Sequence, residues 1–210
     1  MCHFELILFD LDGTLLDTST GIFNSVRFAE RKMNLIKISD ERLKEFVGPP
    51  PKKMYMEVYG LDETSALQAA RYHREYGRTK AVYEAKPYPD MMRTLQQLKQ
   101  RGFRLGVATL KSQEIAEEVL RVNGLLGLFD CVVGMDKDET RKKVDTIHIA
   151  QQQTDSKATV LVGDSAYDYE GAMAAGIDFI GALYGFGFKE SEVYSFDTIK
   201  APVELLSILA

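Results

Sequence analysis

Residues 4–14 read FELILFDLDGT, an apolar run that leads directly into two aspartates, Asp10 and Asp12. The apolar run predicts a buried strand, and Gly13 permits the chain to turn after it. The turn can direct both carboxylates toward one small volume. Two anions so close repel each other unless a cation lies between them, and Mg²⁺, a hard cation that prefers oxygen ligands, is the natural partner. The alternative is an Asp that caps a turn beside a second surface Asp.

A second pair of carboxylates, Asp164 and Asp168, follows another apolar run at residues 158–162. Between the two pairs lie a strand-like segment at residues 105–109, which ends in a hydroxyl, and a basic stretch at residues 140–143. Ligands of open α/β sheets bind outside the carboxyl ends of the strands. We therefore expect all these groups to meet at one edge of a sheet.

Helical and strand-like segments alternate after Pro87, which is typical of right-handed crossovers and a parallel sheet. We expect strands at residues 4–10, 104–109, 131–134, 159–163 and 179–183. We expect connecting helices at residues 90–101, 113–123, 144–153 and 169–175. Residues 18–85 show apolar residues at helical spacing without strand-like alternation. The predicted architecture is a doubly wound α/β core, residues 1–17 and 86–210, with an inserted helical cap at residues 18–85.

The composition favours a cytoplasmic enzyme without nucleic-acid or membrane partners. The chain has 210 residues, 45% of them hydrophobic, and a formal net charge of −5, which argues against a phosphate-backbone or anionic-membrane surface. No apolar stretch reaches membrane-spanning length. Cys2 and Cys131 form no metal motif and fit a reducing compartment. His3, His73 and His148 share no metal-ligand spacing.

Four segments together resemble the motifs of the haloacid dehalogenase superfamily, in its order and spacing. They are DLDGT at residues 10–14, Thr109, Lys143 and GDSAYD at residues 163–168. The sequence is most similar to the phosphoglycolate phosphatase-like branch of this superfamily. VGPP at residues 47–50 also resembles a loop of that branch. The resemblance implies a Rossmann-like core and a four-helix lid at the position of the insert.

The resemblance also implies phosphoryl transfer to an aspartate. Asp10 would be the nucleophile that forms an aspartyl-phosphate, and Asp12 would be the general acid and base. Asp10 and Asp164 would bind Mg²⁺ through their carboxylates, and Asp12 through its backbone carbonyl. The Thr109 hydroxyl and nearby backbone amides, including that of Leu110, would bind the phosphoryl oxygens.

Two assignments stay open at this level. The lysine that offsets the phosphoryl charge is Lys143 or its neighbour Lys142; Lys143 is favoured because it directly precedes the expected helix, although a solvated basic turn is the usual role of such a run. Asp168 lies about one turn into the helix after Asp164, which favours a residue that holds a metal-bound water or the lysine over a direct ligand.

The expected function is a Mg²⁺-dependent phosphatase that acts on a small phosphorylated metabolite: phosphoglycolate, a nucleotide or a sugar phosphate. A phosphomutase of the β-phosphoglucomutase type and, with less support, a catalytically silent binding protein are the alternatives. In the insert, Lys52 and Lys53 follow three prolines and are candidates for substrate contact or for a solvated helix start. The sequence leaves monomer and homodimer equally open.

Overall fold

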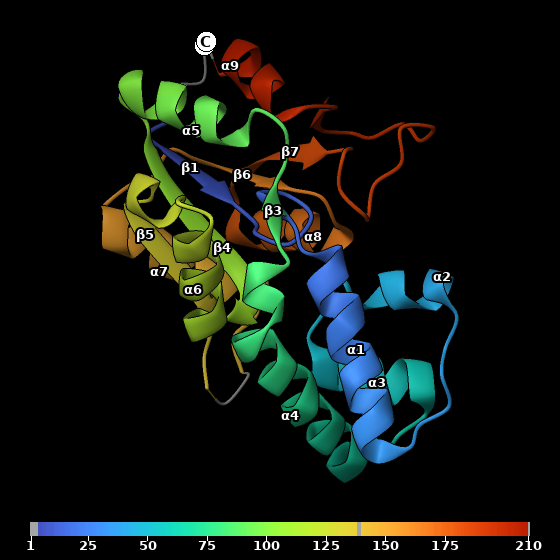
Figure 1. Ribbon diagram of the computed structural model, residues 1–210. Coiled ribbons are helices and arrows are strands. Elements are labelled where there is room, and N and C mark those ends of the chain that lie inside the picture. The colour runs from blue at the N-terminus through green and yellow to red at the C-terminus, as the bar shows by residue number, and fades with distance from the viewer. Residues whose placement is uncertain (1–3, 138–139, 210) are drawn as a thin grey trace.

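One sheet of six parallel strands, in the order β5-β4-β1-β6-β7-β8, forms the centre of the molecule (Figure 1). The computed structural model describes residues 4–137 and 140–209, so Cys2 and His3 lie outside the described residues. The strands are β1 Leu6–Phe9, β4 Arg104–Ser112, β5 Cys131–Met135, β6 Thr159–Gly163, β7 Asp178–Ala182 and β8 Asp197–Ile199. The doubly wound α/β fold predicted from the sequence is confirmed.

The central strand β1 is apolar on both faces because helices cover both faces of the sheet. Its side chains alternate in direction. Ile7 and Phe9 belong to one buried cluster, and Leu6 and Leu8 belong to another. The first cluster includes residues of α5 Met91–Gln100, α6 Gln113–Val122 and α9 Leu205–Ile208. The second includes residues of α7 Lys143–Thr154 and α8 Ala166–Ala175.

The insert between β1 and α5 is helical, as expected. Figure 1 shows its helices gathered on one side of the sheet, away from α5 and α9. They are α1 Ser19–Met33, α2 Asp40–Leu43, α3 Pro51–Tyr59 and α4 Glu63–Thr79. Their buried apolar residues, all between Ile22 and Ala70, form a cluster of their own. This separate cluster supports the proposal that residues 18–85 are a cap domain.

Two short strands join the insert to the core. Leu16–Asp17 (β2) and Lys86–Pro87 (β3) pair antiparallel, with Leu16 opposite Pro87. The chain thus leaves and re-enters the core at neighbouring points. No pattern in the sequence predicts this pair, because two residues are too few to show strand periodicity.

The boundaries of two other elements differ from expectation in ways that concern the site. Strand β4 runs to Ser112, three residues beyond the predicted end, and its register with β5 shifts between Ala108 and Ser112. Helix α8 begins at Ala166, three residues before the predicted start, which places Asp168 in its first turn. β8 and α9 were not predicted. No helix in the described part of the chain is long and apolar enough to cross a membrane.

Candidate active site

The first aspartate of the site continues the alternation of β1. Asp10 follows Phe9 directly, so its side chain points to the same face of the sheet as Leu6 and Leu8, toward α7 and α8. The backbone N–H of Asp10 donates to the carbonyl of Val162 at 2.9 Å, which keeps the residue within the sheet ladder. Only then does the chain turn, with Gly13 at φ 81°. A Cβ at Gly13 would overlap the carboxylate of Asp164, so the turn requires glycine for space as well as for backbone conformation.

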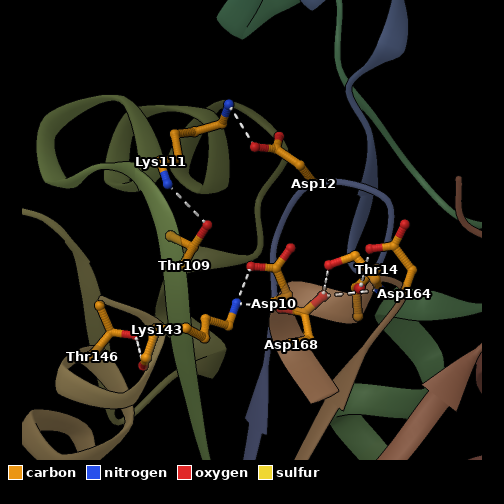
Figure 2. A network of polar contacts seen from close by, with 10 residues as sticks. Asp10, Asp12, Thr14, Thr109, Lys111, Lys143, Thr146, Asp164 and Asp168 are labelled. Carbon is orange, nitrogen blue, oxygen red and sulfur yellow. Dashed lines mark hydrogen bonds and ion pairs between the residues drawn. The ribbon is translucent and has the colours of Figure 1, made fainter. Parts of the chain in front are cut away.

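Lys143 connects two of the carboxylates (Figure 2). Its Nζ lies 2.6 Å from Asp10 Oδ1 and 2.5 Å from Asp168 Oδ1, and all three side chains are buried. Burial opposes the ammonium charge, but the two carboxylates raise the pKa of Lys143 above its ordinary value. Lys142, the alternative, is exposed. The structure therefore brings Lys143, and not Lys142, to Asp10.

Asp164 enters the site from the end of β6 and is held by two donors. Its Oδ1 accepts from Thr14 Oγ1 at 3.2 Å, and its Oδ2 accepts from the backbone N–H of Phe186 at 2.8 Å. Gly185 lies so close that a Cβ there would overlap Asp164. The glycine-rich segment at residues 185–187 thus packs against Asp164.

Asp10, Asp164 and Asp168 each place a carboxylate oxygen within 4.8 Å of the others, and all three are buried. Burial, together with the mutual repulsion of these carboxylates, raises the pKa values of Asp10 and Asp164. The cluster contains three carboxylates and one ammonium group, that of Lys143. The excess of buried negative charge and the oxygen-only donor set fit a hard divalent cation.

Both carboxylate oxygens of Asp168 already have partners, which makes it a poor ligand for such a cation. Its Oδ1 pairs with Lys143, and its Oδ2 accepts from both the backbone N–H and the hydroxyl of Ser165, at 3.1 and 2.6 Å. These partners favour Asp168 as the residue that holds Lys143 in place. Asp164 and the second oxygen of Asp10 have fewer partners and remain the better candidates for metal ligands.

Asp12 points away from this cluster. Its Oδ2 lies 2.9 Å from Lys111 Nζ, and its Oδ1 is buried without a hydrogen-bond partner among the described residues. Asp12 lines a cavity of about 90 Å³ between the core and the insert, where His73, Arg74 and Ser112 are also found. The carboxyl group of Asp12 therefore faces the space next to the cluster, on the side of the insert.

Thr109 lies near the end of β4 and is buried. Its Oγ1 accepts from the backbone N–H of Lys111 at 3.2 Å, and Leu110 between them is half-buried. This hydrogen bond lies within the stretch of β4, between Ala108 and Ser112, where the register with β5 shifts. Lys111 is a site residue that was not predicted from the sequence. Its position two residues after Thr109 is a signal for it, because side chains two apart on a strand point to the same face.

The two candidate lysines for substrate contact, Lys52 and Lys53, have partners within the protein. Lys52 Nζ lies 2.6 Å from Glu63 within the insert. Lys53 Nζ donates to the hydroxyl of Tyr167 at 2.6 Å and lies 5.0 Å from the centre of that ring. Since Tyr167 is in α8 of the core, this hydrogen bond from Lys53 connects the insert to the core next to the site.

This arrangement agrees with the similarity of the whole chain to known proteins. Residues 7–182 match the family of haloacid dehalogenase-like hydrolases. The chain belongs to this family, as its four motifs suggested, and it is an enzyme of the phosphatase class within it.

Individual relatives cover nearly all of the chain. A 5'-nucleotidase of Pseudomonas aeruginosa is 34% identical over 88% of this chain and 85% of its own length. A phosphoglycolate phosphatase of Aquifex aeolicus is 28% identical over 98% of this chain and 96% of its own length. The crystal structure of a predicted phosphatase from Clostridium acetobutylicum is 34% identical, covers 98% of both chains and superposes with a TM-score of 0.90.

Proposed function

We propose that this protein is a Mg²⁺-dependent phosphatase that hydrolyses a small phosphomonoester through an aspartyl-phosphate on Asp10. The observation that carries the proposal is the buried cluster of Asp10, Asp164 and Asp168 around the single ammonium of Lys143. Such a cluster binds strongly to groups that bring positive charge, and it can hold a phosphoryl group only together with a cation.

In the first half of the reaction, a carboxylate oxygen of Asp10 attacks phosphorus in line with the ester bond. The bond from phosphorus to the ester oxygen breaks, and Asp12 gives its proton to the departing alkoxide. In the second half, Asp12 takes a proton from a water molecule that attacks the phosphorus of the aspartyl-phosphate. Inorganic phosphate leaves and Asp10 is restored.

The remaining residues position the phosphoryl group. Lys143 offsets charge on its oxygens and opposes the rise in the pKa of Asp10 that burial causes, and Asp168 holds the lysine. Thr109 and the amide of Leu110 donate hydrogen bonds to the same oxygens. Asp10, Asp164 and the carbonyl of Asp12 would hold Mg²⁺, which supplies further charge neutralisation when bound.

A phosphate-release screen tests the proposal. The panel contains phosphoglycolate, nucleoside monophosphates, sugar phosphates and p-nitrophenyl phosphate, each with and without Mg²⁺. Asp10→Asn should abolish turnover, since the isosteric amide cannot form the acyl phosphate, and Asp12→Asn should slow dephosphorylation so that rapid-quench labelling detects phosphoenzyme. Asp178→Asn, an exposed position at the start of β7, is the matched control.

An Asp10→Asn enzyme that kept a tenth of the wild-type rate would exclude Asp10 as the nucleophile. Normal turnover of Asp12→Asn would exclude the acid and base role. If the phosphoenzyme is stable in water but transfers its phosphoryl group to added sugar phosphates, the protein is a phosphomutase and the proposed phosphatase function is wrong.

A further inference from the structure

Helix α4 carries a row of arginines beside its buried face. Arg71, Arg74 and Arg78 are three and four residues apart, so they share one side of the helix. Burial, and then the like charges of Arg78 and Arg71, lower the pKa of Arg74. Arg78 pairs with Glu114 at 3.2 Å, so Arg71 is the member of the row that stands next to Arg74 without an ion pair among the described residues.

This row borders a groove of about 780 Å³ between α3, α4 and the loop after β5. Five cationic side chains line the groove: Lys52, Lys53, Arg71, Arg74 and Lys137. Glu57 is the single carboxylate among the described lining residues. Such a concentration of positive charge stands out in a chain whose formal net charge is −5.

Some of these cations are already paired and some are not. Lys52 pairs with Glu63, and Lys53 donates to Tyr167. The side chains of Arg71 and Lys137, by contrast, make no hydrogen bond or ion pair in the described part of the chain. Both are exposed. The groove therefore keeps cationic groups available for an anion from outside the protein.

The groove and the active site share lining residues. Pro50 and Arg74 line both the groove and the 90 Å³ cavity that contains Asp12. Pro50 and Lys53 also line a second hollow, of about 420 Å³, that contains Lys143. Arg71 lies three residues before Arg74, about 4.5 Å further along the helix axis. A leaving group next to Asp12 can extend past Arg74 toward Arg71.

We propose that this groove binds a second anionic group, a carboxylate or a phosphate, on the leaving group of the substrate, and that Arg71 is the residue that selects for it. The inference rests on the proposed phosphatase function and narrows its substrate class to phosphomonoesters with a second, distal anion. A guanidinium group binds both kinds of anion through two parallel hydrogen bonds.

Three four-carbon substrates test the inference. Butyl phosphate has no second anion, the phosphate ester of 4-hydroxybutanoate has a carboxylate, and butane-1,4-diol bisphosphate has a phosphate. We expect kcat/KM to be about ten-fold higher for at least one doubly anionic ester than for butyl phosphate, mainly through a lower KM. The comparison of the two doubly anionic esters shows which anion is preferred.

Arg71→Gln should lower the ratio of kcat/KM between the preferred ester and butyl phosphate about ten-fold, and Arg71→Lys should retain part of it. Arg31→Gln, which removes an exposed arginine of α1 outside the groove, is the matched control and should keep the wild-type ratio. Added salt should reduce the ratio in the wild type, because exposed ion pairs are screened.

Equal kcat/KM values for the three esters in the wild type, or an unchanged ratio in Arg71→Gln, would overturn the inference while the phosphatase function stands. Calorimetry with butane-1,4-bisphosphonate and butylphosphonate tests it without turnover. If no ester released phosphate but the bisphosphonate bound more tightly through Arg71, the proposed function would fail and the anion site would remain. Equal binding of both phosphonates would exclude the anion site.

Discussion

The pKa of His73 is set by the buried position of its side chain. His73 lies in α4 at the boundary between the insert and the core, with its ring stacked on Phe46 and its Nδ1 3.4 Å from the hydroxyl of Tyr55. Burial, and then the charges of Lys111 and Arg74, lower its pKa from the ordinary value of 6.5 to about 3. His73 is therefore neutral in the folded protein throughout the physiological pH range.

This shift predicts a pH dependence of stability. Below pH 6.5 the unfolded chain binds a proton at His73 and the folded protein does not, so stability falls as the pH decreases toward 3. Between pH 7 and pH 5 the contribution of His73 to this loss is about 2 kcal/mol. Urea unfolding at the two pH values should show that His73→Gln loses about this much less stability than the wild type.

The exposed His148 provides the control, since His148→Gln should keep the wild-type pH dependence. The same loss of stability between pH 7 and pH 5 in His73→Gln and in the wild type would show that His73 accepts a proton in the folded protein.

At the scale of elements, the start of α8 brings local helix structure and site chemistry together. Asp168 is the third residue of this helix and accepts from both the backbone and the hydroxyl of Ser165, as residues in the first turn commonly do. The same carboxylate pairs with Lys143. The helix start thus fixes the side chain that holds the lysine next to Asp10.

Substitutions at two helix N-caps separate the effect on stability from the effect on activity. Ser165→Ala at α8 and Asp62→Ala at α4 each remove a side chain that closes a helix N-terminus, and each should lower the free energy of unfolding by about 1 kcal/mol. Only Ser165→Ala should also lower phosphatase activity several-fold, because Asp168 then loses a partner that orients it. Equal activity of the two variants would show that Ser165 contributes to stability alone.

At the scale of the whole molecule, four segments distant in sequence supply the site: the loop after β1, the end of β4, the start of α7, and the stretch from the end of β6 to the start of α8. The carboxylates come from the first and the last of these segments, so a cation bound among them would link the two and oppose unfolding of the sheet. Without a cation, the repulsion among Asp10, Asp164 and Asp168 acts on the same segments.

We therefore expect a chelator to abolish activity and to lower the melting temperature, and Mg²⁺ to restore both. At a hundred-fold excess of Mg²⁺ over its dissociation constant, the shift should be about 5 to 10 °C. Asp164→Asn should lose this shift, whereas Asp197→Asn, at an exposed position of β8, should keep it. Full activity in excess chelator would exclude the metal.

The parallel α/β core is predictable from the sequence alone, because alternation along strands and 3.6-residue spacing along helices are local patterns. It also placed Asp10 and Asp164 directly after strands, and parallel strands carry such residues to the same edge. The pairing of β2 with β3 has no local signal, because each strand has two residues and is stabilised by its partner.

The pairing of charged side chains, by contrast, is set by the folded molecule. Lys142 and Lys143 are adjacent in sequence, but the start of α7 buries one against Asp10 and leaves the other exposed. The pairing of Lys111 with Asp12, and the open position of Arg71 beside the paired Lys52, likewise depend on how the insert and the strand ends pack. Charge pairing depends on distance and burial, which are properties of the folded molecule.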